Sequence, residues 1–141
     1  MRTMEDLSLH ILDIIDNSMA AGASEIGVRI EIDTEKDILF IEIKDNGQGM
    51  NAETAKKAID PFYSSKMDKR IGLGIPLLAQ AAREGGGELT LKSETNRGTK
   101  VMARFQLSHP DRKPLGDVEE TIYILQKTHP DITFSFELVR K

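Results

Sequence analysis

Two stretches of alternating apolar residues, 25–33 and 38–44, constrain the fold of this chain most strongly. In each stretch every second residue is Ile, Val or Leu, the pattern of a strand with one buried face. The polar residues 34–37 between them are few enough to form a turn, so the two strands are predicted to pair as an antiparallel hairpin. A sheet with one apolar face must be covered by other elements, and the flanking segments have the pattern of helices.

The remaining elements follow from periodicity and from glycine and proline positions. Helices are predicted over residues 4–21, 52–58, 74–84 and 115–128, a second hairpin over 88–94 and 99–107, and a last strand over 132–139. Residues 60–71 show no period and are predicted to form a polar, basic loop. The element order is not the strict alternation of a doubly wound fold. It predicts an α+β fold, a two-layer α/β sandwich with a mixed, mostly antiparallel sheet and helices on one face.

Length and composition narrow the classes of function. The 141 residues suit one domain, and a net charge of -4 with both signs mixed argues against a nucleic-acid or anionic-membrane surface. There is no cysteine, the three histidines are scattered, and no apolar run approaches the ~20 residues of a membrane span. The N-terminus shows no signal-peptide pattern. A cytoplasmic location is therefore expected.

A first candidate site is the segment Asp45-Asn46-Gly47-Gln48-Gly49-Met50, directly after the second strand. Gly47 and Gly49 carry no Cβ, so their backbone can lie close against a flat ligand. The Asp45 carboxylate only accepts hydrogen bonds, which suits a ligand with an exocyclic amine such as adenine. The same letters are also a common turn sequence, and both interpretations remain open.

A second candidate site lies on the first helix. Asp13 and Asn17 are four residues apart and therefore share a face, beside Asp16. A carboxylate and a carboxamide so placed can orient a water and contribute an oxygen ligand to Mg²⁺. The alternatives are an ordinary solvated helix face and a cap-like hydrogen bond.

Two further turns carry polar groups. Residues 72–74 (Gly-Leu-Gly) precede a helix, where backbone N–H groups and the helix dipole favour an anion such as phosphate. Lys66, Lys69 and Arg70 in the preceding loop add cationic charge for a triphosphate. Thr99 opens a late strand after Gly98, and its hydroxyl can reach a base directly or through water. The alternatives are a tight loop-to-helix turn and a plain hairpin turn.

In order and spacing these segments resemble the ATP-binding domain shared by DNA gyrase B, Hsp90, sensor histidine kinases and MutL, the GHKL superfamily with the Bergerat fold. Residues 13–23 (DIIDNSMAAGA) resemble the N-box of the MutL branch. The segments that resemble the F-box, G2 box and terminal hairpin of histidine kinases are 60–66, 72–75, 85–87 and 97–99. The resemblance covers roughly residues 5–107. It implies an ATP-binding domain over 1–108 and a C-terminal helix–strand extension over 109–141 packed on the same domain.

The resemblance also implies the cofactors ATP and Mg²⁺ and a role for each site residue. Asn17 binds the Mg²⁺ that bridges the phosphates, Asp13 takes the position of the glutamate that activates the attacking water, and Asp45 accepts from the adenine amino group. The other nucleotide-binding residues so implied are Ala21, Gly47, Gly49, Met50, Lys66, Gly72, Leu73, Gly74 and Thr99. Asp13 departs from the family because aspartate is one methylene shorter than glutamate, so its carboxylate reaches ~1.5 Å less far.

The function that the resemblance implies is a Mg-dependent ATP-binding protein, acting as a stand-alone regulatory protein kinase like the histidine kinases or the anti-sigma-factor serine kinases. The alternatives are a slow ATPase switch and a non-catalytic nucleotide-sensing module. An unidentified regulatory protein or phosphoacceptor is the expected partner, with no nucleic acid and no membrane. Whether the chain forms a homodimer is left open.

Overall fold

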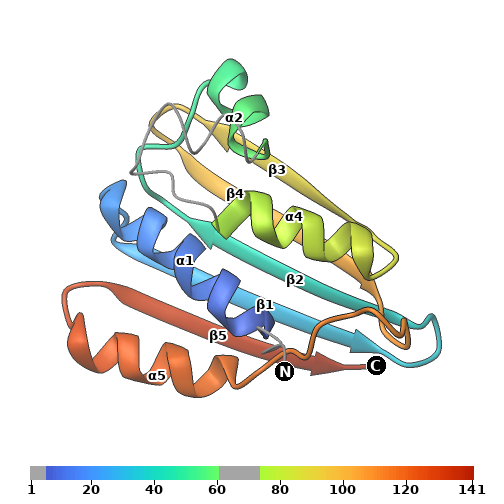
Figure 1. Ribbon diagram of the computed structural model, residues 1–141. Helices are drawn as coiled ribbons and strands as arrows, with labels where there is room; N and C mark the ends of the chain where they lie inside the picture. The colour runs from blue at the N-terminus through green and yellow to red at the C-terminus, as the bar shows by residue number, and fades with distance from the viewer. Residues whose placement is uncertain (1–5, 61–73) are drawn as a thin grey trace, which may run out of the picture.

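The computed structural model describes residues 6–60 and 74–141. In these residues five strands form one sheet in the order β3-β4-β2-β1-β5, with helices over one face (Figure 1). The strands are β1 Glu25–Asp33, β2 Ile38–Asp45, β3 Glu88–Glu94, β4 Gly98–Gln106 and β5 Thr133–Arg140. The helices are α1 Leu7–Ala20, α2 Ala52–Ala58, α4 Gly74–Glu84 and α5 Val118–Thr128. The predicted α+β two-layer class is confirmed.

The sheet is mixed because β5 pairs parallel with its neighbour, whereas the other three strand pairs are antiparallel. The predicted hairpins β1–β2 and β3–β4 are both antiparallel, and β2 joins them by pairing antiparallel with β4. Strand β5 lies at the edge and pairs parallel with β1, with Phe134 opposite Ile26. The three central strands β4, β2 and β1 therefore each have a hydrogen-bonded neighbouring strand on both sides.

The core lies between the sheet and the helices α1, α4 and α5 (Figure 1). Alternate residues of the central strands point into it, such as Ile30 on β1, Ile41 on β2 and Ala103 on β4, each 0% exposed. Ile11 and Ile15 on α1 meet them from the helix layer, also 0% exposed. The period-2 and period-3.6 patterns of the sequence thus face each other across one apolar layer.

Helix boundaries follow local capping groups. Asn51 caps α2, because its side chain accepts from the Thr54 N–H at 2.8 Å. Helix α5 begins at Val118, three residues later than expected. Gly116 adopts a positive φ of 80° and Asp117 accepts from the Glu120 N–H at 3.0 Å, so the helix starts only after this cap.

The C-terminal segment supports the helix that carries Asp13 and Asn17. The first N–H groups of α1, on Leu7 and Ser8, donate to the carbonyls of Pro114 and Leu115 at 2.8 and 3.0 Å. These are the groups that a helix leaves without intrahelical partners. The division into 1–108 and 109–141 remains a prediction. Residues after 108 add α5 to the helix layer and β5 to the sheet. Within the described ranges, no helix has the length and apolar character to cross a bilayer.

Candidate functional site

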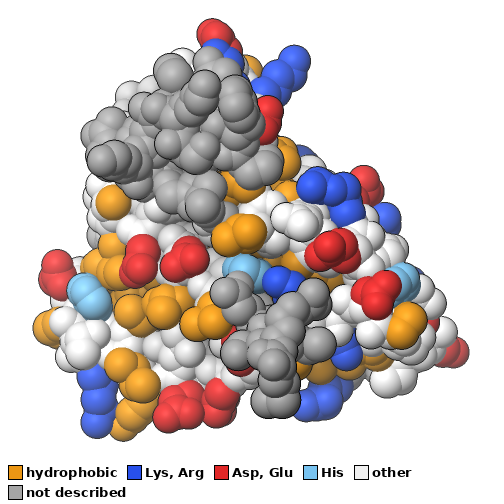
Figure 2. All heavy atoms as spheres, viewed as in Figure 1, with side chains coloured by type: hydrophobic (Ala, Val, Ile, Leu, Met, Phe, Trp, Pro, Cys, Tyr) orange, Lys and Arg blue, Asp and Glu red, His pale blue; other side chains and the backbone are white. Residues whose placement is uncertain are grey.

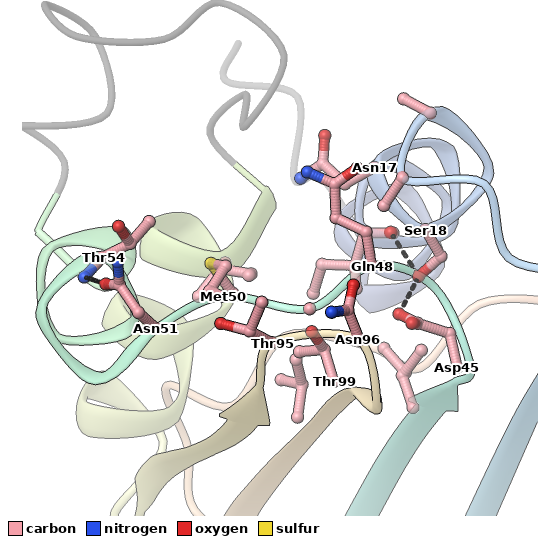
Figure 3. Close-up of a pocket in the computed structure, with 17 residues that line it drawn as sticks. Asn17, Ser18, Asp45, Gln48, Met50, Asn51, Thr54, Thr95, Asn96 and Thr99 are labelled. Atoms are coloured by element: carbon pink, nitrogen blue, oxygen red, sulfur yellow. Dashed lines mark hydrogen bonds between the residues drawn. The ribbon is translucent and has the colours of Figure 1, made fainter.

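A cavity of about 610 Å³ opens between α1, the loop after β2, α2, the start of α4 and the β3–β4 turn (Figure 3). Its polar lining consists of Asn17, Ser18, Asp45, Gln48, Asn51, Thr54, Thr95, Asn96 and Thr99. Its apolar lining consists of Ile14, Ala20, Ala21, Ile43, Met50, Ile75 and Val101, with Gly49 at the edge. A volume of this size accommodates a drug-sized or nucleotide-sized ligand.

Strand register brings Asp45 and Thr99 together. Asp45 is the last residue of β2, and its partner on the neighbouring strand β4 is Thr99. Two residues away along each strand, Ile43 of β2 is paired with Val101 of β4, on the same side of the sheet as Asp45 and Thr99. The cavity therefore has two polar groups at the strand ends and an apolar floor behind them. Two residues that the sequence placed at separate turns belong to one site.

The Asp45 carboxylate is held by two donors. The Ser18 hydroxyl donates to Asp45 Oδ2 at 2.6 Å (Figure 3). The Gly47 N–H donates to Oδ1 at 2.8 Å. Ser18 comes from α1 and is only 4% exposed. Both carboxylate oxygens keep further lone pairs, so a fixed acceptor faces the cavity.

The loop after β2 and the β3–β4 turn approach each other so closely that position 49 requires glycine. Gly49 has a φ of 67°, and a Cβ built on it would lie 2.0 Å from the Glu94 carbonyl oxygen. Beside it, the Gln48 carbonyl accepts from the Asn96 N–H at 2.7 Å. The loop after β2 is thus fastened to the β3–β4 turn. Gly47 is not among the cavity-lining residues; a Cβ there would come 3.1 Å from the Ala21 carbonyl oxygen.

Ser93 joins the loop to the strand that carries Thr99. Its Oγ accepts from the Met50 N–H at 2.8 Å and lies 2.8 Å from the Thr99 Oγ1. It also contacts the Gly98 carbonyl at 3.0 Å. Reasoning from sequence missed this residue, whose only signal is its position opposite Thr99 in the β3–β4 register.

Asn17 and Asp13 differ in their relation to the cavity. Asn17 is half-buried and lines it, whereas Asp13 is exposed and is not among the lining residues. Asp13 lies instead against the first residue of α4, because a Cβ built on Gly74 would come 2.8 Å from the Asp13 Cβ. Gly74 therefore permits α1 and α4 to approach closely. The same arrangement puts a carboxylate beside a helix N-terminus.

The pKa of Asp16 on α1 is raised above its ordinary value. Partial burial raises the pKa of Asp16, the nearby Asp13 charge raises it further, and His129 opposes the rise. The exposed carboxylates of Asp13 and Asp16 give this part of the α1 surface a negative charge. Such a surface favours cations over a bare phosphate.

A magnesium ion fits the donor set only if the nucleotide supplies most of its ligands. The residues that the structure describes contain no group of three or more His, Asp or Glu side chains able to hold a metal. The Asn17 carboxamide at the cavity wall is the kind of hard oxygen donor that Mg²⁺ accepts alongside phosphate oxygens and water. The site thus fits an ion that arrives with the phosphates.

Several predicted residues lie outside the described ranges. These are Lys66, Gly72 and Leu73, together with Lys69 and Arg70. Among the described residues, sequence reasoning missed six polar lining residues: Ser18, Gln48, Asn51, Thr54, Thr95 and Asn96. Ser18 and Gln48 belonged to segments already identified, while Thr95 and Asn96 were interpreted as an ordinary turn.

Comparisons with known proteins identify a family and several relatives. Residues 4–109 match the family model of the histidine kinase-, DNA gyrase B-, and HSP90-like ATPases. The chain is 30% identical over 104 residues to a putative sensor protein of Shewanella frigidimarina, covering 72% of this chain and 16% of that protein. It is 35% identical over 88 residues to sporulation kinase C of Bacillus subtilis, covering 62% of this chain and 20% of that protein. The chain thus spans about a fifth of the length of these relatives.

A solved structure shows the same fold. The crystal structure of the N-terminal domain of a DNA repair protein superposes with a TM-score of 0.67 at 17% sequence identity. The match covers 96% of this chain and 49% of that one. It therefore extends beyond the residues that the family model matches.

Proposed function

Because the chain belongs to the family of histidine kinase-, DNA gyrase B-, and HSP90-like ATPases, we propose that its cavity binds Mg·ATP. The adenine lies against Asp45 and Thr99, and the phosphates extend towards the start of α4. The fixed Asp45 carboxylate carries this proposal, since Ser18 and Gly47 hold its two oxygens at 2.6 and 2.8 Å. An acceptor that is fixed before the ligand binds recognises an exocyclic amine at little ordering cost.

The apolar lining supports a flat base in this position. Ile43 and Val101 form the floor, and Ile75 from α4 lies on the same cavity wall. A purine ring loses water on both faces when it enters such a slot. The Thr99 hydroxyl, already linked to Ser93 at 2.8 Å, adds a second polar contact at the base end.

The phosphate end involves Asn17, Asp13 and the N-terminus of α4. Asn17 would hold a magnesium ion through its carboxamide oxygen, and the ion would supply charge neutralisation for the phosphates. The first N–H groups of α4 favour an anion there. In this proposal Asp13, which lies beside Gly74, would accept a proton from the attacking group or orient it.

The reaction that we propose is phosphoryl transfer to a regulatory protein partner. Family membership and relatives that include a sporulation kinase support kinase-like function. Phosphoryl transfer depends mostly on positioning and charge stabilisation. The described elements would position the nucleotide, and a magnesium ion that arrives with the phosphates would supply the positive charge. The phosphoacceptor has no assigned identity.

A slow ATPase switch or a nucleotide-sensing module is the alternative function, and the position of Asp13 favours it. Asp13 is exposed, outside the cavity lining, and one methylene shorter than glutamate. A base displaced by about 1 Å can lose most of its catalytic effect. Binding without efficient transfer would follow.

Titration calorimetry with ATP and Mg²⁺ tests nucleotide binding. Wild type is expected to bind, and Asp45→Ala to lose binding by at least about 10-fold, since hydrogen bonds to charged groups contribute about 1.5–3 kcal/mol. Asp131→Ala removes an exposed carboxylate outside the cavity and serves as the matched control. Equal affinity of Asp45→Ala and wild type would overturn the assignment.

Incubation with γ-labelled ATP separates the candidate functions. Label on a partner protein supports the kinase, release of free phosphate alone supports the ATPase switch, and binding without either supports the sensing module. Asp13→Asn, run in parallel, distinguishes turnover at this site from a contaminating activity.

A further inference from the structure

Three lysines lie side by side on the sheet face away from the helices. The β2–β4 register places Lys44 opposite Lys100, and the β3–β4 register places Lys92 opposite the same Lys100. Their positions alternate with buried inward residues, Ile43 next to Lys44 and Val101 next to Lys100. We call Lys44, Lys92 and Lys100 the lysine row.

The lysine row is accessible. Lys44 and Lys92 are exposed, and Lys100, on the strand between them, is half-buried. Neighbouring strands are about 4.8 Å apart, so the row extends over about 10 Å across three strands. An ammonium group on a four-carbon stem can adjust over such a line.

Two arginines on the same face have carboxylate partners. Arg29 pairs with Glu31 at 2.9 Å and with Glu137 at 2.7 Å. Arg104 pairs with Glu88 at 3.3 Å, from the adjacent strand. In contrast, within the described residues none of the three lysines has a carboxylate within ion-pair distance.

The lysine row therefore keeps like charges on directly opposite positions of neighbouring strands. Such pairs destabilise a sheet, because the charges repel at short range. The chain as a whole has a net charge of -4, and its helix-covered face mixes both signs (Figure 2). A self-repelling positive row in an acidic chain is explained most directly by an anionic ligand that neutralises it.

We propose that the lysine row is a docking surface for an acidic segment of a partner protein. An extended segment rises about 3.3 Å per residue, so three or four consecutive residues match the length of the row. Carboxylates at alternate positions point to one side of that segment and meet the ammonium groups. The flat outer face of the sheet suits a peptide chain laid across the strands.

The lysine row lies directly behind the cavity. Lys44 precedes Asp45 and Lys100 follows Thr99, whose side chains take part in the cavity on the other face. An acidic partner and a cavity ligand thus occupy opposite faces of the same strand ends without competing. Docking of the acidic segment requires only the three lysines and their register, so it does not depend on nucleotide binding in the cavity.

The test measures binding of a fluorescently labelled hexaglutamate peptide by anisotropy at low salt. The test variant is Lys44→Gln/Lys92→Gln/Lys100→Gln. The matched control is Lys36→Gln/Lys56→Gln/Lys127→Gln, which removes the same charge at exposed positions elsewhere. Wild type is expected to bind, the test variant to bind at least about 10-fold more weakly, and the control variant to stay within about 2-fold.

Amide chemical shifts and a second probe complete the test. On adding hexaglutamate, the shifts are expected to concentrate at residues 44, 92 and 100 and their neighbours, while hexaglutamine and an oligothymidylate cause none there. The proposal is overturned if wild type does not bind hexaglutamate, if both triple variants lose affinity equally, or if the oligothymidylate binds the row more tightly. Circular dichroism and thermal unfolding confirm folding of the test variant, whose midpoint should not fall because repulsion is relieved.

Discussion

The Ser18 hydroxyl donates a hydrogen bond of 2.6 Å to Asp45 Oδ2 and so links the first helix to the end of β2. Ser18 is buried and lines the same cavity as Asp45. The Gly47 N–H holds the other carboxylate oxygen at 2.8 Å. Removing one donor leaves the carboxylate anchored at one side only.

Ser18→Ala is therefore expected to weaken ATP binding by about 10-fold, in line with about 1.5 kcal/mol for a hydrogen bond to a charged group. The change removes one oxygen and leaves the helix packing intact. Titration calorimetry measures the affinity. Ser135→Ala, an exposed serine on the outer strand, is the control and should bind as wild type does. Unaltered affinity in Ser18→Ala would show that Gly47 alone orients Asp45.

Gly49 and Gly22 offer a matched pair of substitutions. Both have positive φ, 67° and 81°, but a Cβ on Gly49 would lie 2.0 Å from the Glu94 carbonyl whereas Gly22 has nothing within 4 Å. Gly22→Ala should cost about 1 kcal/mol of unfolding free energy, the conformational penalty alone. Gly49→Ala should cost about 1–3 kcal/mol more, because the loop must move away from the β3–β4 turn.

Urea unfolding of the two alanine variants measures this difference. Gly49→Ala is also expected to lose ATP affinity, since the displaced loop carries Met50 and Gln48, while Gly22→Ala should keep it. If the two variants lose equal stability, the close approach to Glu94 contributes nothing beyond backbone conformation.

The elements that repeat a strong pattern could be predicted from sequence, while contacts between distant elements could not. Strand β1 is found at the predicted residues because Ile26, Val28 and Ile30 alternate without interruption. Helix α5 starts later than expected because Gly116 and Asp117 form a cap that periodicity does not reveal.

The residues of the site could likewise be predicted only where they belong to a local motif. Asn17, Asp45 and Thr99 could be identified because each belongs to a short motif, and all three line the cavity. Ser93 and Asn96 could not, because their contacts depend on the register of β3 against β4 and on the docking of the turn against Gln48. Local sequence does not encode such pairings.

Asp37 couples stability to pH. Hydrogen bonds from the Ser108 hydroxyl and then the Gln106 amide hold the pKa of Asp37 below its ordinary value of about 3.8. Because the folded-state pKa is lowered, the ionised carboxylate stabilises the fold above pH 3.8, and this contribution is lost as the pH falls through the folded-state pKa. Asp37→Asn keeps a residue that tolerates the positive φ of 59°.

Asp37→Asn is expected to be less stable than wild type at pH 7, and the difference should shrink as the pH falls below 3.8. Urea unfolding at pH 7, 5 and 3 measures it. Asp131→Asn, at an exposed position, should show no comparable trend. A difference that stays constant across this range would mean that the Asp37 charge is not the source of the stability.

In the proposed mechanism, Asp13 acts as the base that activates or orients the group attacking the γ-phosphate. Its side chain lies against Gly74 at the start of α4, outside the cavity lining, and is one methylene shorter than glutamate. Asp13→Glu should extend the carboxylate towards the phosphates and raise the rate of ATP hydrolysis by about 10-fold, whereas Asp13→Asn should lower it by about 100-fold, the range of general-base catalysis. Phosphate release under saturating Mg·ATP measures both, with ATP affinity expected to stay near that of wild type. Asp16→Asn removes the neighbouring charge and should change turnover far less; equal losses in the Asp13→Asn and Asp16→Asn variants would assign the effect to the charge of this helix end and not to a positioned base.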